Sequence, residues 1–306
     1  MKPFSLVFAL VLTLLATGTQ SAGASPMQPT SSIDVGTTHV DVYGSGEPAL
    51  ILVPGLTDSA AIWSGTIAQF APTHKIYALT LAGFGGSKAG ASALIDTAVA
   101  NIASLITEQH LNKPVVIGHS LGGHIVIRVA AEHSALIRGA IAVDGLPVFP
   151  GFDKMTADQR AATAQQITAP MGKQSADEMQ QYEKTQFLPY MTKPKNVDVA
   201  LAAGKGADPT ATAEYMKELL SADVRPELSK DTVPLLELAP FDATLDPYNP
   251  QGPIKTSGEK VALYTSLFST DKNAKVQLID DSRHFIMLDQ SQAFYDAVAA
   301  FLKTLG

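Results

Sequence analysis

The segment Gly118-His119-Ser120-Leu121-Gly122 is the most informative part of the sequence. It follows the apolar run Val115-Val116-Ile117 and precedes a helix-compatible segment over residues 124–132. A serine at the apex of a strand-to-helix turn is held exposed, and small residues flank it because the strand and the helix approach closely there. A serine hydroxyl becomes a good nucleophile only beside a base. The segment therefore predicts a candidate nucleophile, Ser120, at the end of a buried strand.

Apolar runs bounded by glycine and proline alternate with helix-like segments on both sides of this turn. This alternation predicts an α/β fold with a mostly parallel central sheet covered by helices on both faces. Predicted strands cover residues 40–43, 49–53, 75–81, 115–117, 136–143, 233–238 and 275–279, and predicted helices cover residues 91–110, 124–132, 259–267 and 292–305.

The alternation stops between residues 147 and 230, where no convincing strand is found. We interpret residues 147–230 as an inserted helical cap, and residues 39–146 and 231–306 as the core of the fold. Residues 25–38 open with a run rich in proline, serine and threonine, which predicts a flexible lead.

The first residues have the pattern of an export signal. Lys2 supplies a positive charge, residues 4–16 are apolar, and Ala22-Gly23-Ala24 is a small-residue cleavage site. The apolar run is shorter than the roughly 20 residues that span a bilayer. We therefore expect a signal peptide over residues 1–24, export to the periplasm or the medium, and no stable membrane anchor after cleavage.

The amino-acid composition limits the classes of partner and cofactor that the protein is expected to bind. Hydrophobic residues make up 46% of the chain and the formal net charge is −7. A packed core is therefore expected, and nucleic acid is excluded as a partner because phosphate binding needs a basic face. The sequence has no cysteine and no helix-spaced pair of histidine and glutamate, so we expect neither a metal site nor a cofactor.

The candidate base is His284, which follows the predicted strand 275–279 and precedes the closing helix. Two aspartates could orient its imidazole. Asp242, after the strand that follows the insertion, is preferred because it gives the chain order serine, aspartate, histidine. Asp144, after the strand that precedes the insertion, is the alternative, and Asp246 is a distant third. The remaining histidines are assigned to local packing or to the surface: His39, His74, His110, His119, His124 and His133.

An oxyanion formed at the serine would need two backbone N–H donors. Leu121 supplies one, directly after the candidate nucleophile and at a helix N-terminus. Leu56, in the turn Pro54-Gly55-Leu56 after the strand 49–53, is expected to supply the other.

Together these segments resemble the α/β-hydrolase superfamily. Gly118-His119-Ser120-Leu121-Gly122-Gly123 resembles its nucleophile elbow, and Arg283-His284-Phe285 resembles its terminal histidine region. Gly55-Leu56-Thr57-Asp58-Ser59 with Trp63 resembles the oxyanion loop, although Pro54 replaces the usual histidine. Trp63 is a candidate substrate contact, and so is His119, as the alternative to its assignment to local packing. The resemblance also implies a cap in the place of the helical insertion.

The expected function is that of an exported serine hydrolase which cleaves a carboxylic ester, or a related amide or lactone, in a small acyl substrate. One alternative is an aminopeptidase of the proline-releasing type, in which Glu178, Glu183 or Glu214 would hold the substrate ammonium. Another is a ligand-binding module without catalysis on the same fold. A minor alternative is a haloperoxidase or lyase that uses the same serine, histidine and aspartate.

Overall fold

The computed structural model describes residues 27–90, 93–245 and 254–306. The predicted signal peptide and Asp246 lie outside these ranges. The strands are β1 (Ser31–Val35), β2 (Thr38–Tyr43), β3 (Leu50–Val53), β4 (Ile76–Thr80), β5 (Val115–His119), β6 (Gly139–Val143), β7 (Leu235–Phe241) and β8 (Ala274–Asp280).

The helices of the core alternate with these strands. They are α1 (Ser64–Phe70), α2 (Leu94–Glu108), α3 (Leu121–His133), α9 (Ser257–Leu267), α10 (Ile286–Asp289) and α11 (Ser291–Thr304). Within the described ranges, no helix is both long enough and apolar enough to cross a bilayer.

The sheet has eight strands in the order β1-β2-β4-β3-β5-β6-β7-β8. Strands from β4 to β8 pair in parallel, whereas β1 and β2 are antiparallel to their neighbours. The predicted fold class, a mostly parallel sheet flanked by helices, is confirmed. Parallel strands end at one edge of the sheet, so the loops after β3, β5, β6, β7 and β8 meet there.

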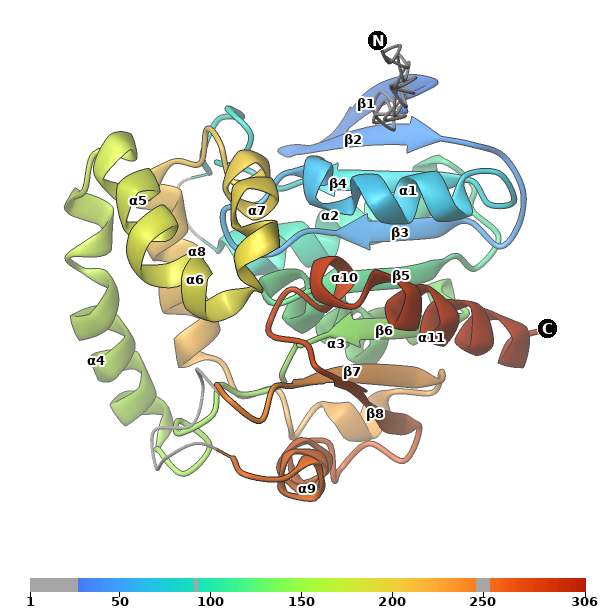
Figure 1. Ribbon diagram of the computed structural model, residues 1–306. Helices are drawn as coiled ribbons and strands as arrows, with labels where there is room; N and C mark the ends of the chain where they lie inside the picture. Colours follow the sequence, from blue (N-terminus) through green and yellow to red (C-terminus); the bar gives the residue numbers. More distant parts are fainter. Residues whose placement is uncertain (1–26, 91–92, 246–253) are drawn as a thin grey trace, which may run out of the picture.

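Helices cover both faces of the sheet (Figure 1), and an apolar layer lies on each face. On one face, Ile51 and Val116 pack with α2, α3 and the end of α9. On the other face, Leu50 and Ile117 pack with α1 and α11. Consecutive strand residues alternate between the two layers, which is why the strand sequences are apolar throughout.

The expectation of a flexible lead over residues 25–38 is wrong for its second half. Strand β1 lies within it and pairs with β2, with Ile33 opposite Val40 and Val35 opposite Thr38. Val35 is buried and Ile33 is partly buried against the core. The serine and threonine composition concealed this short alternation of apolar and polar residues.

Five α-helices lie between β6 and β7 and gather at one side of the sheet (Figure 1). Capping boxes begin two of them, with Thr156 and Ser175 as N-caps. Asp208 caps a third by accepting a hydrogen bond from the N–H of Ala211. Side-chain caps satisfy N–H groups that have no partner in the helix. The helices are α4 (Ala157–Thr168), α5 (Ala176–Tyr182), α6 (Leu188–Met191), α7 (Val197–Ala203) and α8 (Pro209–Ser221).

Candidate active site

The turn at Ser120 has the strained backbone that its sequence predicts. Ser120 has φ 55° and ψ −117°, and a positive φ is unfavourable for a residue with a side chain. The Ser120 N–H donates to the carbonyl of Val143 on the neighbouring strand β6 (3.0 Å), and its own carbonyl accepts from the N–H of His124 (2.9 Å). The turn is therefore fixed from the sheet side and from the helix side.

Close backbone approach explains the glycines around Ser120. A Cβ on Gly118 would lie 2.1 Å from the carbonyl oxygen of Gly122, and a Cβ on Gly122 would lie 2.3 Å from that of Val53. Side chains at either position would force the α3 N-terminus away from β5 and from the loop after β3. The same lack of a side chain lets Gly123 approach Gly145, where an added Cβ would lie 2.7 Å from the Gly145 Cα.

The carboxylate that contacts His284 is that of Asp144. His284 lies between β8 and α10, and its Nδ1 is 2.5 Å from Oδ2 of Asp144. Both side chains are almost fully buried. Asp144 directly follows β6, which is the neighbour of β5 in the sheet, with Val143 in register with His119. Ser120 and Asp144 therefore emerge from adjacent strands.

The preference for Asp242 as the partner of His284 is wrong. Asp242 follows β7, and its Oδ2 accepts hydrogen bonds from Nζ of Lys193 (2.9 Å) and Nε of Arg283 (3.0 Å). Its Oδ1 accepts from the backbone N–H and the hydroxyl of Thr244. Burial raises the pKa of Asp242, but these hydrogen bonds outweigh it and hold the pKa well below its usual value. Two cations thus bind the carboxylate of Asp242.

Two buried carboxyl groups, those of Asp144 and Glu237, have opposite pKa shifts. Burial raises the pKa of Asp144, but the charge and hydrogen bond of His284, together with Lys260 and Tyr264, bring it below the usual value. Burial and the negative charge of Asp144 raise the pKa of Glu237, on β7, well above its usual value. Like charges this close cannot both be ionised at low cost. These opposite shifts favour the ionised form of Asp144 and the protonated form of Glu237.

The two predicted oxyanion donors lie on segments that touch each other. Leu121 begins α3, and Leu56 follows the end of β3. A Cβ on Gly122 would lie 2.5 Å from the carbonyl oxygen of Pro54, so the α3 N-terminus packs against the Leu56 loop. Within the described residues, neither the Leu56 nor the Leu121 N–H donates to a protein acceptor. Free N–H groups at a helix N-terminus are suited to bind an anion.

His119 is buried and packs against the histidine loop. Its Nε2 donates to the carbonyl oxygen of His284 (3.1 Å). Its ring lies 4.5 Å from the His284 ring and 4.7 Å from the Phe285 ring, centroid to centroid. Burial, followed by the positive charge of His284, lowers the pKa of His119 well below its usual value. A buried, neutral ring in this position corrects its assignment as a substrate contact.

Trp63 is likewise a core residue. Its side chain is fully buried and its ring centroid lies 6.2 Å from that of Phe294 on α11. It belongs to the apolar layer under α1 and α11, whereas the site lies at the edge of the sheet. The resemblance of the loop led to the assignment, but the 3-10 turn over Ala60–Trp63 directs this residue into the core.

Ser120, Asp144 and His284 line one small cavity of about 30 Å³. Its other lining residues are apolar: Leu146, Phe149, Pro150 and Leu219. Leu219 comes from α8, so the helical insertion contributes to the wall beside Ser120.

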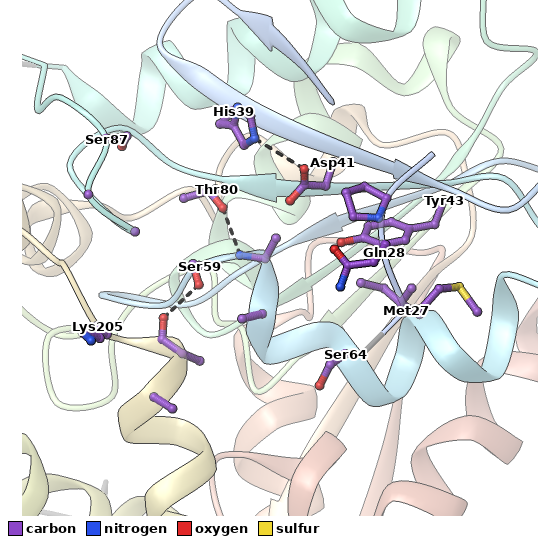
Figure 2. A pocket seen from close by; sticks show the side chains of 18 of the residues that line it. Met27, Gln28, His39, Asp41, Tyr43, Ser59, Ser64, Thr80, Ser87 and Lys205 are labelled. Atoms are coloured by element: carbon purple, nitrogen blue, oxygen red, sulfur yellow. Dashed lines mark hydrogen bonds and ion pairs between the residues drawn. The ribbon is translucent and has the colours of Figure 1, made fainter. Parts of the chain in front are cut away.

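A larger groove of about 1050 Å³ lies elsewhere on the molecule. Figure 2 shows it between Met27 and Tyr43 on one side and Ser59 and Lys205 on the other. Neither Ser120 nor His284 lines this groove. Catalysis needs a nucleophile and a base together, so the small cavity, and not the larger groove, is the candidate active site.

The sequence matches the alpha/beta hydrolase family over residues 50–297. This range runs from β3 into α11 and includes Ser120, Asp144 and His284. The chain therefore belongs to the alpha/beta hydrolase family.

Solved structures with the same fold include an enol-lactonase from Burkholderia xenovorans, with a TM-score of 0.68 and 18% identity over 89% of this chain and 100% of that chain. A thermophilic esterase from Thermogutta terrifontis has a TM-score of 0.70 and 16% identity over 90% of this chain and 99% of that chain. Identities this low establish a shared fold alone.

Curated relatives include a lipase and an esterase. The lipase LipV of Mycobacterium tuberculosis is 35% identical over 39% of this chain and 48% of its own length. A pimeloyl-[acyl-carrier protein] methyl ester esterase of Vibrio vulnificus is 24% identical over 65% of this chain and 77% of its own length. The chain spans about half the length of the first of these relatives.

Proposed function

We propose that this protein is a serine hydrolase that cleaves a carboxylic ester through a covalent acyl-enzyme. Ser120 attacks the ester carbonyl, and His284 accepts the hydroxyl proton and returns it to the leaving alcohol. Water then hydrolyses the acyl-enzyme with the same base. Asp144 holds the imidazole with Nδ1–H toward its carboxylate, so that Nε2 can accept the proton from serine.

The observation that carries this proposal is the bond between Asp144 and His284 at the cavity that also contains Ser120. The free N–H groups of Leu56 and Leu121 would stabilise the alkoxide that forms on the carbonyl oxygen. An apolar lining suits an uncharged acyl or alcohol group. The lipase and esterase relatives agree with ester cleavage.

The aminopeptidase alternative would need a carboxylate free to bind an ammonium group. Glu178 accepts hydrogen bonds from Ser175 as part of a helix cap, and Glu214 pairs with Lys217. Glu183 is buried, and its pKa is raised by that burial. None of the three lines the cavity at Ser120, so no observation favours this alternative.

The test is turnover of p-nitrophenyl esters of increasing acyl length, measured with the wild-type protein and Ser120→Ala. We expect hydrolysis by the wild type and a loss of about 10³-fold or more in kcat for Ser120→Ala. Amino-acyl p-nitroanilides serve as the comparison for the aminopeptidase alternative. Ester hydrolysis that is equal in the wild type and Ser120→Ala would overturn the proposal.

A further inference from the structure

The second carboxylate oxygen of Asp144 has a partner of its own. Oδ2 faces His284, and Oδ1 accepts a hydrogen bond from the hydroxyl of Tyr264. Tyr264 is 1% exposed and lies on α9, 120 residues beyond Asp144 in the chain. We propose that Tyr264 is a positioning residue that fixes the rotation of the Asp144 carboxylate, and through it the orientation of His284. This inference rests on the proposed function.

The N-terminus of α9, the helix that carries Tyr264, is stabilised by side-chain caps. Thr256 and Glu259 form a capping box at the N-terminus of α9. Lys260 and Tyr264 are four residues apart and therefore share one face of the helix. Both are buried, and Nζ of Lys260 lies 4.8 Å from the centre of the Tyr264 ring. Contact with this cation keeps the phenol ring in place.

Asp144 needs such support because its position is unusual. It has φ 49° and stands in a turn directly after β6. A carboxylate held by one hydrogen bond can rotate about its terminal torsion, which is broad and nearly two-fold. A second donor on the opposite oxygen removes this freedom. Only one rotation of the carboxylate then satisfies both Tyr264 and His284.

Two residues of α9 favour the ionised form of this carboxylate. After His284, Lys260 and the hydroxyl of Tyr264 contribute to the lowered pKa of Asp144. Protonation of Asp144 would turn an acceptor into a donor and would disrupt its bond with the Nδ1–H of His284. The α9 residues therefore act on the charge of Asp144 as well as on its geometry.

The variant to make is Tyr264→Phe, which removes only the hydroxyl. We expect kcat to fall about tenfold or more, since hydrogen bonds to charged groups are among the strong ones, while KM is unchanged. The acid limb of the kcat/KM profile should move to higher pH, because the Asp144 oxygens keep more negative charge and favour protonated His284. Tyr77→Phe is the matched control: Tyr77 is also 1% exposed, and Nζ of Lys75 lies 5.3 Å from its ring centre.

A double-mutant cycle separates positioning from general loss of structure. Tyr264→Phe should have no further effect on kcat in an Asp144→Asn background. Additive losses, or a folded Tyr264→Phe protein with wild-type kcat and an unmoved acid limb, would overturn the inference. A fall in kcat with an unmoved acid limb would do the same, because it indicates a merely structural role.

Proton NMR provides a measurement that does not depend on turnover. The Nδ1 proton of His284 in a short bond to Asp144 should resonate far downfield and disappear in Asp144→Asn. We expect the chemical shift of this proton to change in Tyr264→Phe and to be unchanged in Tyr77→Phe. If the wild type shows the resonance but hydrolyses no ester, the proposed function fails while the positioning role stands. An unmoved resonance in Tyr264→Phe overturns the positioning role.

Discussion

Asp144 Oδ2 lies 2.5 Å from Nδ1 of His284, although the two residues are 140 positions apart in the chain. Asp242, which stands nearer in sequence and also follows a strand, instead binds Lys193 and Arg283. We therefore expect the two aspartates to have different roles. Substitution of Asp144 should lower activity, and substitution of Asp242 should lower stability.

Asp144→Asn should abolish most of the activity. The amide can present its N–H₂ to the imidazole and favour the wrong tautomer, so that Nε2 no longer accepts the serine proton. We expect kcat to fall about 10³-fold or more, measured with the best p-nitrophenyl ester. Asp242→Asn is the matched control and should keep kcat within about tenfold of wild type. A larger loss of kcat in Asp242→Asn than in Asp144→Asn would show that Asp242 serves as the acid.

Asp242→Asn should lower stability instead. Because the pKa of Asp242 is lowered in the folded state, its contribution to stability is present above the ordinary value of 3.8 and is lost as pH falls through the folded value. We expect a loss of about 2 kcal/mol at pH 7 in urea unfolding. The difference from wild type should narrow at pH 3. A constant difference at both pH values would contradict the ionic role.

Glu237→Gln should change how stability depends on pH. The pKa of Glu237 is raised in the folded state by burial and by Asp144. Its contribution to stability is therefore greatest below the ordinary value of 4.5 and declines as pH rises toward the folded value. The neutral amide does not titrate. Urea unfolding should show that the free energy of unfolding of Glu237→Gln, relative to wild type, is higher at pH 8 than at pH 5. A higher relative value at pH 5 would be inconsistent with a protonated Glu237.

Trp63→Ala should affect folding and not substrate binding. The side chain is fully buried against Phe294, and truncating a buried tryptophan costs about 3–5 kcal/mol through lost burial and the cavity left behind. Chemical unfolding measures this loss, and Trp63→Phe provides a milder variant that folds more readily. KM for the ester should be unchanged in the folded fraction. A raised KM with unchanged stability would restore Trp63 as a substrate contact.

Much of the fold follows from local sequence patterns. The apolar runs and the glycines around Ser120 predict the parallel sheet and the strained turn, because both depend on residues close together in the chain. Strand β1 is missed since a five-residue edge strand rich in serine has a weak signal.

The choice between Asp144 and Asp242 depends on strand order and on distant cations, which a sequence does not specify. The sequence contains one indication in favour of Asp144, because Arg283 stands directly beside His284 and an arginine there attracts another carboxylate, that of Asp242.

The prediction that Trp63 contacts substrate is wrong for a related reason. The resemblance of the loop predicts where its backbone runs, but the direction of a side chain in a short 3-10 turn depends on packing against α11.

The nucleophile is tested directly by the mass of the protein after incubation with a fluorophosphonate, with the adduct located by peptide mapping. We expect one adduct on Ser120 in the wild type and none in Ser120→Ala. Labelling should be much slower in Asp144→Asn and near the wild-type rate in Asp242→Asn. A folded wild-type protein that takes up no label, or labels at another residue, would contradict this expectation.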